Sequence, residues 1–291
     1  MPLKGYTTFR IGGPAELLAK ANDPRELRDI VRLAKAARIS ARVIGAGSNI
    51  LAGDKGVKGL VIKLDSFVFK RISLEGSCRV RAGAGVLLSR FISFCRLKSL
   101  SGAEFLAGIP GTIGGGLVMN AGISVKGGNS KTGERTIADL VETVRVMDYN
   151  GEIKELKAKE IKFAYRDSGL SRYIVLEAVF RLRKRDKTRI LREIREYIAR
   201  RRQNQDYSYP SAGCVFRNPA AAALPAGKLI DRSGLKGKKI GSAAVSLKHA
   251  NFIINLGNAR AKDVLNLILL IKKQVKRDFK VNLETEIRIW K

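Results

Sequence analysis

The spacing of apolar side chains changes repeatedly along the chain, and each change predicts a new strand or helix. Three short apolar runs near the N-terminus have the length of strands: residues 16–21, 41–45 and 59–64. Between the first two, the stretch 22–40 places apolar side chains every three to four residues. It opens with Asp23, Pro24 and Glu26, a combination that begins helices. The first sixty or so residues are therefore predicted to form a strand–helix–strand unit.

The rest of the chain continues this mixture of elements. Further strands are predicted at 67–73, 78–82, 140–148, 152–156, 173–183, 241–246, 251–256 and 283–290. Helices are predicted at 86–97, within 181–202 and at 262–279. The layout predicts an α+β chain in three parts, residues 1–66, 67–186 and 187–282, with the last strand, 283–291, returning to the first part.

Composition narrows the class of protein. Of the 291 residues, 45% are hydrophobic and 28% are charged, a balance typical of globular domains. The longest apolar run, 267–271, is far shorter than the roughly 18 residues of a membrane span, and the start of the chain lacks a signal-peptide core. Three cysteines without paired spacing and a single histidine argue against a disulfide framework and a structural zinc site. We expect a cytoplasmic protein that holds no metal.

The charge is unusual, because 56 lysines and arginines stand against 26 acidic residues, a formal net charge of +30. Such an excess attracts polyanions, which include nucleic acids, anionic membranes and phosphorylated small molecules. The most basic span, 181–202, has helical spacing, with Arg189–Glu193 and Arg192–Glu196 as pairs four residues apart. The span predicts either an ordinary solvated helix or a basic surface whose electric field speeds the approach of an anionic ligand.

Two glycine-rich segments are candidates for binding phosphate. In the first, "VIGAGSNIL", Gly45 and Gly47 let backbone N–H groups approach phosphate oxygens, and the side chains of Ser48 and Asn49 add donors. Ile50 stands where the third glycine of a dinucleotide-binding fingerprint would fall, so the segment is not that motif. An ordinary tight turn is the alternative.

The second segment, "GIPGTIGGG" (108–116), holds five glycines and one proline. This composition argues against a regular helix or a central strand, and its backbone donors can wrap a pyrophosphate. A surface turn is the alternative, although Ile109, Ile113 and Leu117 are unusually apolar for one. Two such segments together suggest one long, doubly phosphorylated cofactor.

Two charged segments contain further candidates for functional residues. In "FAYRDSGL", Arg166 can fork onto a carboxylate, or it and Asp167 are plain surface charges. In "LETEIRIW", strand alternation puts Glu284, Glu286 and Arg288 on one face. Acidic residues in such positions usually face solvent, and they matter only if that face lines a cleft.

A lone cysteine, Cys214, lies among turn-forming residues in "YPSAGCVFRNP". Free cysteines are commonly buried as small apolar filler, and composition alone favours that interpretation. A reactive thiol held at a turn is the alternative.

Taken together, these segments resemble one family, the UDP-N-acetylenolpyruvoylglucosamine reductases (MurB) of peptidoglycan synthesis. The matching words, in family order from residue 7 to residue 287, are "TTFRIGGPAE", "GAGSNIL", "GIPGTIGGG…MNAG", "YRDS", "SAGCVFRNP", "LIDRSGLKG", "GSAAVSLKHANFIIN" and "LETEI". The chain is similar to the shorter type of the family, which lacks a tyrosine-bearing insertion. The resemblance implies a vanillyl-alcohol-oxidase-like (PCMH-type) FAD-binding region of two subdomains, followed by an α+β substrate-binding domain.

The resemblance also implies the reaction and its cofactors. Family members bind FAD noncovalently, NADPH reduces the flavin, and the flavin N5 passes a hydride to the enolpyruvyl ether of the UDP-sugar, which gives UDP-N-acetylmuramate. The cofactor-binding residues implied by the matching words are Gly45, Ala46, Gly47, Ser48, Asn49, Ile50, Gly108, Ile109, Pro110, Gly111, Thr112, Gly114, Gly115, Asn120 and Gly122. The lone histidine, His249, lies far from these segments in the sequence, so we expect no attachment of FAD through histidine.

Roles for single residues follow from the resemblance as well. Arg166 would stabilise the carbanion that hydride transfer creates, and Glu286, protonated, would hydrogen-bond the substrate carboxyl group. Cys214 stands where the family usually has serine, the proton donor to the carbanion carbon. A thiol, with an ordinary pKa of about 8.5, can do the same as long as it stays protonated. The residues expected beside the substrate are Tyr165, Arg217, Asn218 and His249.

Two segments depart from the family pattern. "NAGISVKGGNS" replaces the usual "NAGAYGGE", which alters the loop 123–130, and the common Gln-Pro is missing before "SYPSAG". A basic nucleic-acid-binding protein is the alternative function, but the basic span lacks nearby aromatic stacking platforms. As a reductase, the chain is expected to be a monomer that binds a UDP-sugar, without a membrane or a specific nucleic-acid partner.

Overall fold

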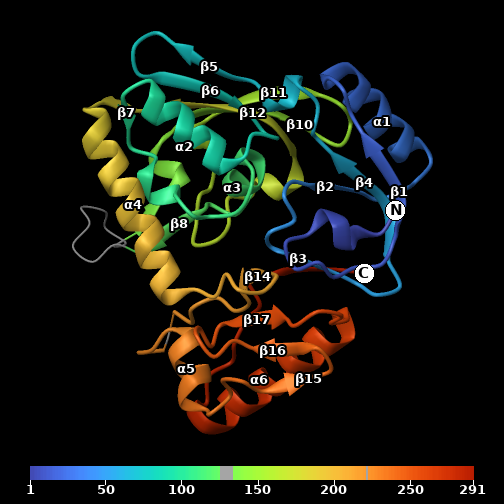
Figure 1. Cartoon of the computed structure of the whole chain (residues 1–291). Helices are drawn as coiled ribbons and strands as arrows, with labels where there is room; N and C mark the ends of the chain where they lie inside the picture. Colours follow the sequence, from blue (N-terminus) through green and yellow to red (C-terminus); the bar gives the residue numbers. More distant parts are fainter. Residues whose placement is uncertain (125–133, 221) are drawn as a thin grey trace. The chain divides into compact units, whose positions relative to one another are not determined.

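The structure is a computed structural model that describes residues 1–124, 134–220 and 222–291 (Figure 1). Its strands are β1 (Ala15–Lys20), β2 (Ala41–Ile44), β3 (Ile50–Ala52), β4 (Val57–Lys63), β5 (Ile72–Glu75), β6 (Arg79–Gly83), β7 (Leu100–Ser101), β8 (Gly122–Ser124), β9 (Glu134–Thr136), β10 (Val141–Met147), β11 (Ile153–Lys157), β12 (Ile174–Arg181), β13 (Arg183–Lys184), β14 (Ser211–Cys214), β15 (Lys239–Ile240), β16 (Ala243–Val245), β17 (Phe252–Asn255) and β18 (Arg288–Trp290). Its α-helices are α1 (Pro24–Ala36), α2 (Leu88–Leu97), α3 (Ile113–Val118), α4 (Lys187–Asn204), α5 (Ala226–Arg232) and α6 (Ala261–Phe279). Short 3₁₀ helices are η1 (Leu3–Tyr6), η2 (Val68–Lys70), η3 (Glu104–Leu106), η4 (Ile137–Asp139), η5 (Ala158–Glu160) and η6 (Leu170–Arg172).

Close contacts divide the chain into two compact units, each assembled from separate stretches of sequence. The central unit comprises residues 18–46 and 59–200, and the terminal unit comprises residues 1–17, 47–58 and 201–291. The three-part division expected from the sequence stays a prediction beside this division by contacts.

The first helix forms as the sequence predicts. The side chain of Asp23 accepts hydrogen bonds from the backbone N–H groups of Arg25 and Glu26 at 2.7 and 3.0 Å. This N-cap satisfies donors that the first turn of a helix leaves without partners. Leu27 and Val31 bury the apolar face. β2 then pairs in parallel with β4, which completes the predicted strand–helix–strand unit.

A five-stranded antiparallel sheet in the order β11-β10-β12-β6-β5 forms much of the central unit. Its inner face carries fully buried apolar side chains, among them Val80, Val144 and Phe180. Phe91 of α2 packs on this face, with its ring centroid 4.7 Å from that of Phe180. Each large side chain buried in this way contributes about 1.5–3 kcal/mol.

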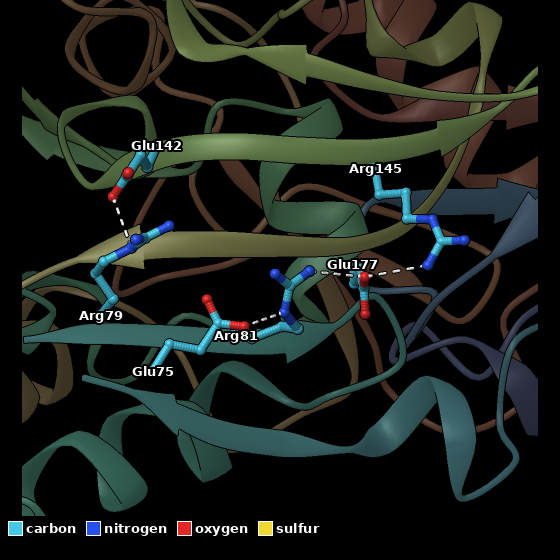
Figure 2. A network of polar contacts seen from close by, with 6 residues as sticks. All are labelled: Glu75, Arg79, Arg81, Glu142, Arg145 and Glu177. Atoms are coloured by element: carbon cyan, nitrogen blue, oxygen red, sulfur yellow. Dashed lines mark hydrogen bonds and ion pairs between the residues drawn. The ribbon is translucent and has the colours of Figure 1, made fainter.

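The outer face of the same sheet is charged. Figure 2 shows the ion-pair network there, which consists of Glu75, Arg79, Arg81, Glu142, Arg145 and Glu177. Arg81 contacts Glu75 and lies 2.9 Å from Glu177, and Arg145 reaches the same Glu177 at 3.5 Å. Alternation along β6 and β12 explains why one face is apolar and the other ionic. The pairs are partly exposed, so each contributes at most about 1 kcal/mol, and the network is best explained as a solvated sheet face.

The terminal unit contains a four-stranded antiparallel sheet in the order β14-β17-β16-β15. α6 packs on β15 and β16, and its residues Val264, Leu267 and Ile271 are fully buried. β18 runs parallel to β3, with Ile289 opposite Leu51. The C-terminal strand is thus fixed beside the segment that directly follows the first glycine-rich loop.

The strand predicted over 67–73 is wrong in its first half. Val68–Lys70 form η2, and β5 begins only at Ile72. The backbone N–H of Lys70 donates to the carbonyls of Ser66 and Phe67, which closes a helical turn. Phe69 is buried while Phe67 is 81% exposed, so the apolar run does not supply the regular alternation of a strand.

The second glycine-rich segment was expected to exclude a regular helix, and that expectation is also wrong. The segment ends in α3, which Thr112 caps by accepting a hydrogen bond from Gly115 N at 3.3 Å. Ile113 and Leu117 are fully buried. Their burial and the cap outweigh the cost of about 1 kcal/mol that each helical glycine carries.

The ion pairs predicted along α4 do not form. Glu193 instead pairs with Arg185, which precedes the helix, at 2.5 Å. Arg189, Arg192 and Glu196 take part in no ion pair within the part of the chain that the structure describes. Spacing four residues apart permits a pair, but an arginine just outside the helix competes for the same carboxylate.

Two further expectations concern the remaining segments. Among the described residues, no helix is both long enough and apolar enough to cross a membrane. The loop 123–130, which departs from the family pattern, falls largely within 125–133, and those positions lie outside the described residues.

Candidate functional site

The two glycine-rich segments meet inside the central unit. A methyl group added at Gly45 would fall 2.6 Å from the Oγ1 atom of Thr112, so the lack of a side chain lets the two segments touch. The ammonium of Lys63 donates to the carbonyl oxygen of Gly45 at 3.2 Å, and burial lowers the pKa of Lys63. The contact places a partly buried positive charge beside the first glycine-rich loop.

The backbone donors of this loop are available to a ligand. The N–H groups of Gly45, Ala46 and Gly47 donate no hydrogen bond to any described residue. Gly47 has a φ of +62°, in the left-handed region. Successive N–H groups with a left-handed residue among them form a concave binding site for anions. The loop therefore fits a phosphate group of the cofactor that the sequence predicts.

Gly47 allows a direct test of this geometry. A methyl group there would lie 2.1 Å from the carbonyl oxygen of Tyr6, whereas Gly76 has the same φ of +62° and nothing within 4 Å. We expect Gly76→Ala to lower the free energy of unfolding by about 1–2 kcal/mol, the cost of a left-handed alanine. Gly47→Ala is expected to cost about 1–3 kcal/mol more, because a backbone carbonyl must move. Denaturant unfolding measures both, and equal losses would contradict the close approach of residues 6 and 47.

The second segment uses two of its backbone donors to anchor its own helix, and its part in binding the cofactor stays a prediction. Ile113 N donates to Val86 O at 2.8 Å and Gly114 N donates to Ala84 O at 2.9 Å. These two donors anchor the start of α3 and are not available to wrap a pyrophosphate. Gly108 and Gly111 have φ values of +78° and +153°, so the preceding turn needs glycine.

The turn that bears Arg166 is tied to the end of the same segment. Asn120, itself buried, donates from Nδ2 to Ala164 O at 3.0 Å, and Ser168 Oγ donates to Val118 O at 3.1 Å. Arg166 has a φ of +54°, which is rare for a residue with a side chain. Strain of this kind, about 1–3 kcal/mol, is commonly found at functional sites.

Within this turn the side chains of the predicted pair contact each other. The Arg166 guanidinium lies over the Tyr165 ring at 5.3 Å from its centroid. The carboxylate of Asp167 accepts hydrogen bonds from Ser168 N and Gly169 N, so it stabilises the turn. The segment "YRDS" is therefore a braced turn with Arg166 at its tip.

In the terminal unit, Cys214 and Glu286 come from segments that lie side by side. Cys214 ends β14, and Glu286 N donates to Val215 O at 2.7 Å. The Nδ2 atom of Asn49, from the first glycine-rich loop, donates to Glu286 O at 3.1 Å. Glu284 is exposed and Glu286 is half-buried, although the predicted strand alternation puts both on one face; the strand itself begins only at Arg288. Three predicted site residues therefore form one group, and Arg166 belongs to the other unit.

The residues predicted beside the substrate have well-defined surroundings. Arg217 N donates to Glu284 O at 2.9 Å, and Asn218 Oδ1 accepts from Ala226 N at 3.1 Å, at the start of α5. His249 Nδ1 accepts from the backbone N–H of the second residue after it, at 3.2 Å. Burial lowers the pKa of His249, so its imidazole is neutral at pH 7.

Sequence reasoning missed the residue that holds the Cys214 strand in place. Asn251 Oδ1 accepts from Phe216 N at 2.9 Å, and Asn251 Nδ2 donates to Phe216 O at 2.8 Å. Asn251 is 3% exposed. An asparagine at the start of the apolar run "NFIINL" was the available signal, since a buried amide needs partners.

No group of three or more His, Cys, Asp and Glu side chains is placed to hold a metal ion within the described residues. The polar groups described above can bind and polarise an anionic ligand, stabilise developing negative charge and donate a proton. Each unit by itself therefore contributes groups suited to binding an anionic cofactor or substrate.

Family models match most of the chain. The model of the FAD binding domain matches residues 15–157. The model of the C-terminal domain of UDP-N-acetylenolpyruvoylglucosamine reductase matches residues 205–290.

Individual proteins match over the full length. UDP-N-acetylenolpyruvoylglucosamine reductase 2 of Symbiobacterium thermophilum is 43% identical over 291 residues, covering 99% of this chain and 90% of the relative. The reductase of Clostridium novyi is 39% identical over 289 residues, with coverages of 99% and 90%. The crystal structure of UDP-N-acetylenolpyruvylglucosamine reductase (MurB) from Thermus caldophilus superimposes with a TM-score of 0.82 at 38% identity, covering 100% of this chain and 98% of that one.

Proposed function

This chain belongs to the family of UDP-N-acetylenolpyruvoylglucosamine reductases, and we propose that Cys214, Arg166 and Glu286 carry out its reduction step. The family resemblance and the fold class predicted from the sequence are confirmed. The chain is a flavin-dependent oxidoreductase of peptidoglycan precursor synthesis that uses FAD and NADPH.

The first glycine-rich loop is proposed to hold the cofactor. FAD, when bound, accepts a hydride from NADPH and supplies it to the enolpyruvyl ether of the UDP-sugar. The backbone N–H groups of Gly45, Ala46 and Gly47 would bind its pyrophosphate, because they donate to no described residue. Lys63 adds a positive charge beside them. These residues fit the anionic part of FAD.

Arg166 is proposed to stabilise the negative charge that hydride addition leaves on the substrate carbon next to the carboxylate. A guanidinium at the tip of a braced turn can be aimed at that charge before it develops, which is how electrostatic stabilisation works best. The support is the strained backbone at Arg166 and the hydrogen bonds from Asn120 and Ser168 that brace the turn.

Cys214 is proposed to complete the reaction as proton donor. Its S–H bond breaks as the new C–H bond forms at the carbanion carbon, and the thiolate that remains takes a proton from water. Glu286, protonated, would donate a hydrogen bond to the substrate carboxylate at the same place. The observation that carries this proposal is the 2.7 Å hydrogen bond from Glu286 N to Val215 O, which brings two distant segments together.

The two half-reactions test the function. Purified protein should be yellow, NADPH should bleach its flavin absorbance under anaerobic conditions, and UDP-N-acetylglucosamine-enolpyruvate should restore it. A protein that takes up no FAD, or whose bleached flavin ignores this substrate, would overturn the assignment.

Two neighbouring glutamates offer a matched comparison. We expect Glu286→Ala to slow restoration of the flavin absorbance by about 10- to 100-fold, because it removes the donor of a hydrogen bond to a charged group, which contributes about 1.5–3 kcal/mol. Glu284→Ala, at an exposed position of the same segment, should leave that rate unchanged. Stopped-flow absorbance measures both, and bleaching by NADPH is the internal control. Equal effects of the two substitutions would remove Glu286 from the mechanism.

Four further side chains are proposed to contact the substrate. Arg217, Asn218, Tyr165 and His249 would bind the UDP-sugar, with the neutral imidazole of His249 acting as a hydrogen-bonding group and not as a cation. The monomeric state and the cytoplasmic location also stay predictions from the sequence.

A further inference from the structure

Asn251 holds the chain immediately after Cys214 through hydrogen bonds from both its backbone and its side chain. Its backbone carbonyl accepts from Val215 N at 2.8 Å. Its side chain accepts from Phe216 N at 2.9 Å and donates to Phe216 O at 2.8 Å. Because Asn251 is only 3% exposed, breaking these bonds would leave polar groups buried without partners. Residues 215 and 216 are therefore firmly held within the terminal unit.

The strand that leads to Cys214 is irregular. Between Ser211 and Cys214, β14 holds one more residue than the facing part of β17. Gly213, within this bulge, has a φ of +76°, in the left-handed region. Bulges turn a side chain in a new direction and are common beside active sites. Cys214 thus lies between a bulge and the residues that Asn251 holds, which fixes the backbone that carries the thiol.

The backbone N–H of the same asparagine holds the imidazole of His249. Asn251 N donates to His249 Nδ1 at 3.2 Å. The ring also packs against Phe252, with 4.9 Å between the two ring centroids. A methyl group added at Gly227 of α5 would lie 3.3 Å from Cε1 of the imidazole, so the backbone of this helix is close as well. These contacts fix the ring and join it to the residue that holds the segment after Cys214.

The hydrogen bond from Asn251 also decides which ring nitrogen of His249 carries the proton. A neutral imidazole has one donor nitrogen and one acceptor nitrogen, and Nδ1 is the acceptor here. The proton therefore belongs to Nε2, which makes no hydrogen bond to any described residue and is not enclosed in the protein interior. Burial lowers the pKa of His249, which keeps the ring neutral. The ring thus offers an N–H donor to a ligand.

We infer that Asn251 is a positioning residue for the reduction step: it holds the segment 214–218 and the His249 imidazole in one arrangement, with Nε2–H of His249 as a donor to an acceptor oxygen of the UDP-sugar. The inference rests on the proposed roles of Cys214 and His249. Asn251 acts through the residues that it holds and takes no proton or hydride itself. A displacement of reacting groups by about 1 Å can slow a reaction about 10²-fold, so loss of this amide should affect the rate as well as the stability.

Asn255, at the other end of β17, provides a matched control. It is 1% exposed, and its Nδ2 donates to Phe9 O at 3.0 Å. Its Oδ1 accepts from Gly257 N at 2.9 Å and from Ala259 N at 3.1 Å. Within the described chain, its side chain makes no hydrogen bond to the segment 214–218 or to His249. Both asparagines are therefore buried amides that hold backbone groups, but only Asn251 holds residues assigned to the reaction.

The first test compares alanine variants of the two asparagines in FAD-loaded protein. Both should lower the thermal midpoint, because each loses a buried amide with its hydrogen bonds. NADPH should bleach the flavin of both at the parental rate. With saturating UDP-N-acetylglucosamine-enolpyruvate, Asn251→Ala should restore the flavin absorbance about 10- to 100-fold more slowly than the parent, whereas Asn255→Ala should restore it at the parental rate. Asn251→Asp keeps the size of the side chain and the acceptor for Phe216 N, and it replaces the alanine variant if that variant does not take up FAD.

The second test needs no substitution, because His249 is the single histidine of the chain. FAD-loaded protein without a histidine tag is prepared with isotopically labelled histidine, and NMR shows which ring nitrogen carries the proton. We expect the proton on Nε2, and the Nε2 resonance should move when UDP-N-acetylmuramate is added. A proton on Nδ1 would overturn the inference, since that nitrogen could not accept from Asn251 N. An Nε2 resonance that ignores saturating product would overturn it as well.

Equal slowing of restoration by the two alanine variants would also overturn the inference, because a loss of stability alone affects both. The outcome is separable from the proposed function. If the parent protein takes up no FAD, or its bleached flavin ignores the substrate, the function fails and the positioning role fails with it. If the parent responds and Asn251→Ala matches it in both steps, only the positioning role fails. If Cys214→Ala restores the flavin at the parental rate, the proton donor is wrong, and the comparison of the two asparagines still decides the role of Asn251.

Discussion

Replacing Cys214 by alanine is expected to lower the steady-state rate of the reductase by about 10²- to 10⁴-fold, the usual contribution of a positioned proton donor. The side chain ends β14 beside the segment that carries Glu286, and Asn251 fixes the residues that follow it. Removing the thiol leaves this backbone intact, so the loss should fall on the chemical step. Cys214→Ser restores a proton donor and should keep a substantial part of the rate.

The other cysteines control for general effects of thiol removal. Cys78 is half-buried and belongs to the central unit, whereas Cys214 belongs to the terminal unit, and no role in the reaction is assigned to Cys78, so Cys78→Ala should leave the rate unchanged. Consumption of NADPH with saturating substrate gives the rate, and FAD absorbance gives the amount of loaded enzyme. An alanine variant with the parental rate at equal FAD content would show that Cys214 is a small apolar filler.

Replacing Arg166 by glutamine is expected to lower the rate by about 10²- to 10³-fold, as the loss of one stabilising donor at a developing charge does elsewhere. Glutamine keeps a polar side chain of moderate length and removes the charge. Arg166→Lys should be intermediate, because an ammonium keeps the charge but cannot form the two-pronged contact of a guanidinium. Since any non-glycine residue at this position keeps the left-handed backbone, the thermal midpoint should change little.

Arg172 is the matched control for Arg166. It lies in the same unit and its guanidinium is 5.1 Å from the Tyr173 ring centroid, much as Arg166 is 5.3 Å from that of Tyr165. Arg172→Gln should leave the rate unchanged. Comparable losses for both arginines would mean that Arg166 acts through charge or folding in general and not at the substrate.

Structural elements that depend only on residues close together in the chain could be predicted from the sequence. Asp23 and the residues after it predicted the start of α1, because an N-cap acts within one turn. The left-handed Gly47 and the open backbone donors near it lie where the glycine pattern indicated a phosphate loop. The sequence segments that match the family pattern pointed to Cys214 and Glu286, and in the structure these two residues lie on adjacent segments.

Features that depend on contacts between distant residues could not be predicted in the same way. The apolar run at 67–73 fits a strand or a helical turn equally well, and backbone hydrogen bonds to Ser66 and Phe67 decided it. Glycines disfavour a helix, but burial of Ile113 and Leu117 stabilises α3 despite them.

The central claim, that the thiol of Cys214 delivers the proton, is tested most directly by anaerobic single turnover. Cys214→Ala loaded with FAD is mixed first with NADPH and then with UDP-N-acetylglucosamine-enolpyruvate, and the flavin absorbance is followed through both steps. We predict bleaching at the parental rate and restoration slowed by about 10²-fold or more, with Cys214→Ser close to the parent in both steps. Restoration at the parental rate in the alanine variant would contradict the claim.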